Sequence, residues 1–164
     1  MNIYSREEKN MKNFKRVLAL LVVLFLTITL TGCGKKAITA AEFKSKMEEK
    51  GYTVTDFTTT MASSTGAKEA LIANNTNTSI IIEFLTFDDE SVVKDSVEEL
   101  YNNAKDKDGA KSTTEINMGN YNKRTVKIGD DYYVIERVEK TLLYVVATKD
   151  TAKEADQIVE DLGY

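Results

Sequence analysis

Apolar residues follow three patterns along the chain. Residues 17–30 form one uncharged apolar run. Further on, apolar residues recur at helical spacing, which predicts amphipathic helices at residues 40–50, 89–104 and 151–162. Segments rich in β-branched and aromatic residues predict strands at residues 52–57, 70–73, 79–87, 115–118, 121–128, 132–138 and 142–148. The polar segments 58–66 and 106–114 are expected to be loops.

The starts of these helices carry residues that stabilise helix termini. Thr39 and Glu42 have the spacing of a capping box, in which each side chain bonds the other residue's backbone N–H group. Asp88 is the expected N-cap of the second helix. Thr151 and Glu154 repeat the capping-box spacing at the third helix. The sequence therefore places the helix starts near residues 40, 89 and 151.

The strands in the second half of the chain are joined by short turns, which is typical of an antiparallel sheet. We therefore expect an α+β domain, with an antiparallel sheet of six to seven strands and three helices packed mainly on one face, in two layers. Leu142–Ala147 is apolar at six successive positions, so both faces of its strand should be covered. Helices would cover one face. Either a loop such as 58–66, or a partner or lipidic ligand, would cover the other.

Composition limits the chemistry further. The 164 residues include no His and one Cys, which excludes His-dependent catalysis, His metal sites, an intrachain disulfide and a multi-cysteine metal site. Residues 33–164 hold 17 Lys and Arg against 24 Asp and Glu, a net charge of −7. An acidic domain is a poor candidate for binding nucleic acid. No cofactor is expected.

The apolar run 17–30 has the features of a signal-peptide core. It follows three basic residues, Lys12, Lys15 and Arg16. A membrane-spanning helix needs about 20 apolar residues, so the run is short for a permanent span and has the right length for a signal peptide. Residues 1–32 are therefore expected to be a cleaved signal peptide, with Met11 as an alternative start.

The run ends in Leu30-Thr31-Gly32-Cys33. An aliphatic residue, two small residues and a Cys in this context resemble the lipobox of bacterial lipoproteins. The resemblance implies that a diacylglycerol is attached to the Cys33 thiol, that cleavage follows Gly32, and that the amine of Cys33 is acylated as well. The alternative is a plain signal peptide with an incidental Cys. The domain that follows has the general look of small lipoproteins of Gram-positive bacteria.

A lipidated Cys33 would hold the domain, residues 39–164, at the outer face of the bacterial cytoplasmic membrane. Only Gly34–Ile38 remain as a tether, and five extended residues reach at most about 17 Å. The domain would therefore stay close to the membrane. Lys35 and Lys36 are expected to contact lipid headgroups.

Four tyrosines lie on neighbouring predicted strands: Tyr121, Tyr132, Tyr133 and Tyr144. Adjacent residues of a strand point to opposite faces, so Tyr132 and Tyr133 should lie on opposite sides of the sheet. The outward-facing tyrosines would suit an aromatic interaction surface, because Tyr offers a large contact area at low entropic cost. Ordinary cross-strand packing explains the same residues.

Two further features involve carboxylates. Asp106, Asp108 and Glu115 overlap an EF-hand loop, but Ala104 occupies its first ligand position, so an acidic turn without a metal is expected. Glu83 lies within an apolar strand, where it either marks the solvent-facing side or faces the core and needs a basic partner. The candidate partners are Lys123, Arg124 and Arg137. A buried Glu83 would also be a candidate general acid or base.

These observations favour a non-enzymatic, lipid-anchored binding module close to the membrane, with a membrane protein as its partner. The first alternative is a lipoprotein that binds or senses a small ligand or metal ion. The second alternative is an envelope hydrolase that uses carboxylates. No spacing in the chain resembles a nucleophile elbow, a glycosidase pair or a phosphate loop.

Overall fold

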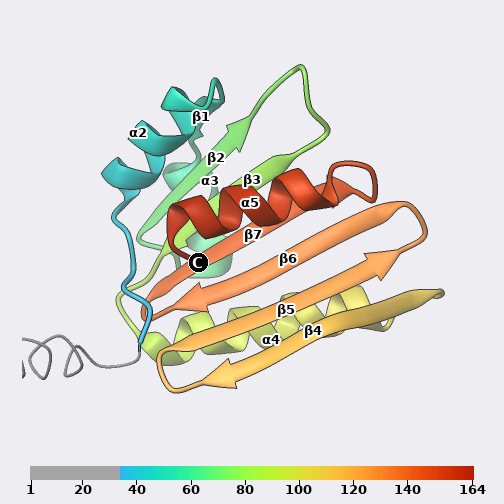
Figure 1. Ribbon diagram of the computed structural model, residues 1–164. Helices are drawn as coiled ribbons and strands as arrows, with labels where there is room; N and C mark the ends of the chain where they lie inside the picture. Colours follow the sequence, from blue (N-terminus) through green and yellow to red (C-terminus); the bar gives the residue numbers. More distant parts are fainter. Residues whose placement is uncertain (1–33) are drawn as a thin grey trace, which may run out of the picture. The chain divides into compact units, whose positions relative to one another are not determined.

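In the computed structural model, seven strands form one antiparallel sheet in the order β1-β2-β3-β7-β6-β5-β4 (Figure 1). The strands are β1 Thr53–Asp56, β2 Glu69–Asn74, β3 Ile81–Thr86, β4 Ala110–Met118, β5 Tyr121–Ile128, β6 Asp131–Val138 and β7 Thr141–Thr148. The structure describes residues 34–164, apart from the side chains of Ser112 and Thr113. The expected signal peptide and lipobox, including Cys33, lie outside the described residues.

The helices of residues 34–164 lie on both faces of this sheet. They are α2 Ala40–Glu49, α3 Thr58–Thr65, α4 Glu90–Lys105 and α5 Ala152–Leu162. In Figure 1, α5 lies in front of the sheet and α4 behind it. Residues of α2 and α5 belong to one buried core, and residues of α3 and α4 to the other. None of the helices in this part of the chain is long and apolar enough to cross a membrane.

The α+β class with an antiparallel sheet is confirmed, but the arrangement of the helices differs from the expectation. Helices were expected mainly on one face, in two layers, whereas the described domain has three layers. The strand β6 shows why: Val134 and Ile135 are adjacent, both are fully buried, and they belong to different cores. Successive side chains of a strand point to opposite faces, so each face of this strand is covered.

The helix α3 was missed, because its segment was expected to be a loop. Apart from Met61, its eight residues are small or polar, and none of them is buried. Local bonds hold it instead. The Asp56 carboxylate accepts the Thr58 N–H at 2.8 Å, and the Thr58 hydroxyl accepts the Ala70 N–H at 2.9 Å. Gly66, with φ of 70°, ends the helix in the left-handed conformation that favours glycine.

The expected helix caps have different outcomes. The capping box of Thr39 and Glu42 at the start of α2 is confirmed. Asp89, one residue later than expected, caps α4 by accepting the Ser91 N–H at 2.8 Å. The capping box expected at α5 is absent, because no side chain caps that helix start. The Thr151 hydroxyl instead accepts the N–H of Thr148 at 3.1 Å.

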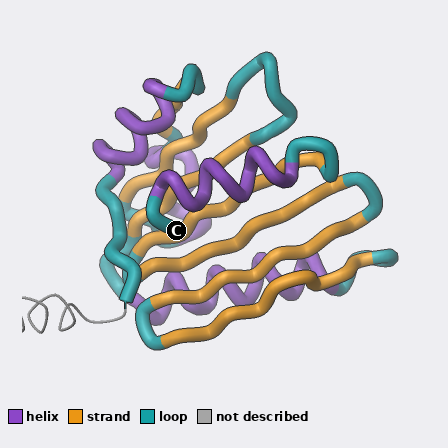
Figure 2. The backbone as a smooth tube through the Cα atoms, in the orientation of Figure 1, coloured by secondary structure: helices purple, strands orange, loops and turns teal. Residues whose placement is uncertain are grey.

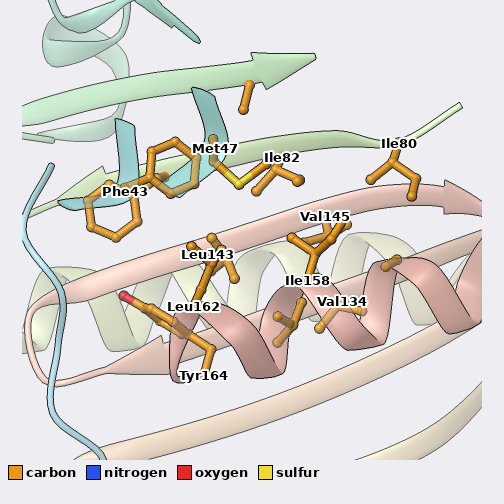
Figure 3. Close-up of a cluster of buried hydrophobic side chains, with 14 of the residues drawn as sticks. Phe43, Met47, Ile80, Ile82, Val134, Leu143, Val145, Ile158, Leu162 and Tyr164 are labelled. Carbon is orange, nitrogen blue, oxygen red and sulfur yellow. The ribbon is translucent and has the colours of Figure 1, made fainter. Parts of the chain in front are cut away.

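One core fills the space between the sheet and the helices α2 and α5. Figure 3 shows Ile158 and Leu162 of α5 next to Leu143 and Val145 of β7, and all four side chains are buried. Towards α2, the Phe43 ring stacks on a phenylalanine of β3, with 4.8 Å between ring centroids. This face of the two central strands, β3 and β7, is therefore closed by packing.

The segment between Gly34 and Thr39 runs past one end of the sheet to reach α2 (Figure 2). We call this end of the sheet the tether end. There the β4–β5 turn meets the tether, since the Asn120 side-chain amide donates to the Lys35 carbonyl at 2.8 Å. The register places the start of β7 and the end of β3 at the same end, because Thr141 pairs with Thr86.

Candidate binding groove between two helices

A groove of about 230 Å³ opens on the α3 and α4 face of the sheet. The central strands β3 and β7 form its floor, and the two helices form its walls. The walls are lined by Met61, Ser64 and Thr65 of α3 and by Ser96, Glu99 and Leu100 of α4. The floor is lined by Glu83 and Leu85 of β3, by Phe87 just after β3, and by Leu142 and Tyr144 of β7. A larger hollow of about 370 Å³ along the β2–β3 turn is lined by no ionisable side chain. Of these two hollows, the groove is the one with titratable side chains on its lining.

Glu83 occupies the middle of the groove floor. Its cross-strand neighbours are Ile72 on β2 and Tyr144 on β7. The residues two positions away along its own strand on the same face are Ile81 and Leu85. The carboxylate is half-buried, and burial in these surroundings raises the pKa of Glu83. No hydrogen bond or ion pair of this carboxylate is found within residues 34–164. Glu83 is therefore partly desolvated without compensation.

The basic residues expected to pair with Glu83 all have other partners. Arg137 is fully buried and lies 2.9 Å from the Glu90 carboxylate at the start of α4. Arg124 contacts two other glutamates, Glu98 at 3.2 Å and Glu115 at 3.4 Å. Lys123 pairs with Glu136 at 3.0 Å. The expectation of a basic partner for Glu83 is therefore wrong, and so is the expectation that it simply faces solvent, because it lines a groove.

Tyr144 lies opposite Glu83 and contributes a neutral phenol to the groove. Burial, with smaller effects from Tyr133 and Glu83, raises the pKa of Tyr144 to about 12. Its ring stacks on the Tyr133 ring, with 6.3 Å between centroids and 16° between planes. The phenol therefore stays protonated at neutral pH and offers both a donor and an acceptor next to the carboxylate.

The four tyrosines of the expected aromatic surface divide between the two faces. Tyr133 and Tyr144 stack on the groove side. Tyr121 and Tyr132 lie in the core on the α5 side, where the Tyr132 hydroxyl donates to Asp156 of α5 at 2.8 Å. The opposite orientations of Tyr132 and Tyr133 follow the expected alternation. The structure thus brings together only one pair of the four at the groove.

The opposite face holds a different arrangement of charge around Glu136. Glu136 is fully buried, and its two oxygens lie 2.9 Å from the Lys35 ammonium and 3.0 Å from the Lys123 ammonium. The Lys35 ammonium also lies 4.2 Å from the centre of the Tyr121 ring. Lys35 was expected to contact lipid headgroups, but in the structure it binds the domain. Lys36 is exposed.

The tether is held by its backbone as well. Besides the Asn120 bond to the Lys35 carbonyl, Gly34 packs closely against Asn120, since a Cβ at Gly34 would lie 2.8 Å from its amide nitrogen. Such a distance leaves no room for a larger residue at position 34 without movement of Asn120. The chain is therefore attached to the domain from Gly34 onward.

The acidic residues that overlap an EF-hand loop do not converge. Asp106 ends α4, and Asp108 lies in the following turn. Glu115 lies on β4, 3.4 Å from the Arg124 guanidinium. Within residues 34–164, no group of three or more Asp, Glu or Cys side chains is placed to hold a metal ion.

The fold and the site define an α+β domain with helices on both faces of an antiparallel sheet and a groove floored by its central strands. In comparisons with known proteins, the chain matches no family model, no curated protein and no solved structure. The function must therefore be argued from the groove, which the sequence pattern did not reveal because α3, the helix that forms one of its walls, was not expected.

Proposed function

We propose that the protein is a lipid-anchored, non-enzymatic binding module that engages a membrane-protein partner through the groove between α3 and α4. The observation that carries the proposal is Glu83, a half-buried carboxylate without a partner on an otherwise apolar floor. Burying a charge without compensation costs stability, and such a cost persists where the group serves binding. A ligand that compensates this charge would recover the cost.

The hydroxyls of the groove support binding rather than nucleophilic catalysis. The side chains of Ser64 and Thr65 donate to the Met61 carbonyl, at 3.1 and 2.9 Å. The Ser96 side chain donates to the Val92 carbonyl at 2.9 Å. Each hydroxyl is thus bonded to its own helix, and a nucleophile would need a base in contact with it.

The docked tether supports a location close to the membrane. If Cys33 carries the lipid, only one residue separates it from Lys35, whose side chain and backbone both bind the domain. Two residues span about 7 Å when extended. The tether end of the sheet would then be held at the lipid surface, and the domain would meet partners in the membrane or directly beside it.

Crosslinking in intact cells tests this proposal. A photoreactive residue at position 96, on the groove wall, is compared with one at position 160, on the exposed side of α5, in the chain with its native anchor. The proposal expects one recurrent membrane protein from position 96 only, and its loss in a Cys33→Ala variant. The same products from both positions, or no product from position 96, would contradict it.

A carboxylate-dependent hydrolase is the second candidate, because Glu83 and Glu99 line the same groove. One is half-buried with a raised pKa and the other is exposed, which is the asymmetry that separates an acid from a base. Release of sugars or peptides from wall fragments would favour this function if both Glu83→Gln and Glu99→Gln abolished it. If the native chain released neither sugars nor peptides, the hydrolase would be contradicted and the binding module would remain the proposed function.

A further inference from the structure

The groove carries negative charge that residues 34–164 do not neutralise locally. Its two ionisable carboxylates, Glu83 and Glu99, come from the floor and from one wall, and its lining includes no Lys or Arg. The remaining ionisable group, Tyr144, is neutral because its pKa is raised to about 12. Burial alone accounts for the raised pKa of Glu83, so no basic group close by offsets it. The groove is therefore complementary to a cation.

Apolar and polar side chains follow a definite order on this face of the sheet. Three cross-strand pairs of β3 and β7 follow one another on this face of the sheet: Ile81 with Val146, which lie beyond the groove lining, Glu83 with Tyr144, and Leu85 with Leu142. The carboxylate and the phenol thus form a polar pair between two apolar pairs. A ligand that fits this sequence has an apolar stem beside its cationic group, rather than a cation surrounded by further polar groups.

The size of the groove limits what can fill it. Its volume of about 230 Å³ lies below the range of roughly 300–1,000 Å³ that is usual for pockets that enclose a whole organic ligand. The apolar surface continues beyond the groove, since Ile81, two residues before Glu83 on β3 and outside the groove lining, is 45% exposed. One long side chain of a larger partner would fill the groove while the partner's surface covers Ile81.

We propose, on the basis of the binding function proposed above, that the groove receives a lysine side chain of a protein partner. The ammonium would pair with Glu83 and lie next to the Tyr144 hydroxyl. The aliphatic stem would lie over the apolar pair formed by Leu85 and Leu142. Lysine combines a flexible four-carbon stem with a compact charge, which matches a floor that places a single carboxylate beside the apolar pair Leu85 and Leu142.

The test compares two peptides that differ only in the ammonium group. One is an acetylated and amidated pentapeptide with a central lysine between leucines, and the other carries norleucine at that position. Binding of fluorescently labelled peptides to the full chain in detergent micelles is followed by fluorescence anisotropy. We expect the lysine peptide to bind at least about tenfold more tightly, because a charge-assisted hydrogen bond to a partly buried group contributes about that much.

Variants locate the effect. Glu83→Gln should weaken the lysine peptide at least about tenfold and remove its advantage over the norleucine peptide. Glu160→Gln, an exposed carboxylate on α5, is the matched control and should change neither affinity. Equal affinities for the two peptides, or an unchanged affinity in Glu83→Gln, would overturn the proposal.

A third arm separates a protein-bound lysine from a free amine. Butylammonium carries the same four-carbon stem and charge without a peptide. If it displaces the labelled peptide at similar concentration, the groove is a site for small organic cations, and the assignment to a protein partner is wrong. This test can fail without contradicting the proposed function. A crosslink at position 96 that persists in Glu83→Gln would support the binding module and would contradict the proposal that the groove receives a lysine.

Discussion

Two glutamates lie on opposite faces of the same sheet, and only one of them has ion-pair partners in the described domain. Glu136, on the α5 side, is 0% exposed and lies between two lysine ammonium groups at 2.9 and 3.0 Å. Glu83, on the groove side, is half-buried, and no ion pair is found for it among residues 34–164. Glu136 is fully and Glu83 partly removed from water, and only for Glu136 does the described domain compensate the charge.

The buried arginines resemble Glu136 in that each is paired with a group of opposite charge. Arg137 donates to the Glu90 carboxylate at 2.9 Å and to the carbonyls of Gly119 and Glu139 at 2.8 and 3.0 Å. Arg124 is 3% exposed and pairs with two glutamates. In the described part of the chain, charges that serve the fold are therefore paired. Glu83 departs from this rule at the centre of the sheet, which is why we assign it to binding.

The largest effect is expected at Glu136. Glu136→Gln keeps the shape of the side chain and removes the charge between Lys35 and Lys123, which leaves two ammonium groups close together. Breaking a buried ion pair on one side typically costs about 3 kcal/mol of unfolding free energy. Urea unfolding of the full chain measures the loss. Glu160→Gln, an exposed change of the same type, should alter stability by less than about 0.5 kcal/mol.

An unchanged urea midpoint for Glu136→Gln would contradict the role assigned to Glu136, since its ion pairs would then contribute nothing to folding. A large loss of stability that is partly restored by a second change, Lys123→Met, would support that role. In that double variant fewer uncompensated charges remain near the core, so part of the stability should return.

The comparison also shows what the sequence could predict. Most strands and the helices α2, α4 and α5 were found, because strong alternation or a helical stripe marks them. The continuous apolar run 142–147 correctly indicated a strand with helices on both sides, although Tyr144 and Val146 are only half-buried on the groove side. The helix α3 could not be found in this way, since it has a single large apolar residue, Met61, and no buried stripe. It depends instead on bonds of Asp56 and Thr58.

The charges were visible in the sequence, but their partners were not. Glu83 stood out as a charge within an apolar strand, and three basic residues were equally good candidates to pair with it. Which pairs form depends on strand order and register. Lys123 faces Glu136 because β5 pairs with β6 in a register that places them opposite each other. The register of β3 with β7 likewise places Tyr144 opposite Glu83. These relations involve residues about 13 to 61 positions apart and leave no local signal.

The second effect has the opposite sign. Glu83→Gln removes a partly desolvated charge that has no partner in the described domain, so it should stabilise the free protein. The half-exposed position limits the gain to at most about 1 kcal/mol. Urea unfolding at neutral pH measures it, and Glu99→Gln on the exposed wall is the control. A loss of stability in Glu83→Gln would mean that the carboxylate is compensated after all.

The third effect is the pH dependence of that gain. Because burial raises the pKa of Glu83, the folded state favours the protonated carboxyl. The cost of the charge is therefore fully present above the raised pKa and is lost as the pH falls through the ordinary value. The stability difference between Glu83→Gln and the native chain should therefore shrink as the pH falls from 7 to below the ordinary value of 4.5. The other ionisable groups that line the groove are Glu99, which the Glu99→Gln variant controls for, and Tyr144, which does not titrate in this range. A difference that stays constant between pH 7 and pH 4 would contradict the assignment.

The smallest effect on stability is expected at Lys35. Its side chain is 33% exposed, and Glu136 keeps Lys123 as a partner when Lys35 is removed. Lys35→Met should therefore cost less than about 1 kcal/mol of unfolding free energy. The local effect should be larger, because the ammonium over Tyr121 and the ion pair both hold the tether to the sheet. Hydrogen exchange of the full chain should show faster exchange in the segment 35–38 and unchanged exchange in β6.

This variant separates two contributions to the proposed function. If the tether only attaches the domain to the lipid, Lys35→Met should leave the crosslink from position 96 intact. If the docked tether also fixes which end of the sheet faces the membrane, the crosslink should weaken while the protein stays membrane-bound and folded. Loss of the crosslink without any change in tether exchange would contradict both, because the ion pair on one face would then influence the groove on the other through the sheet itself.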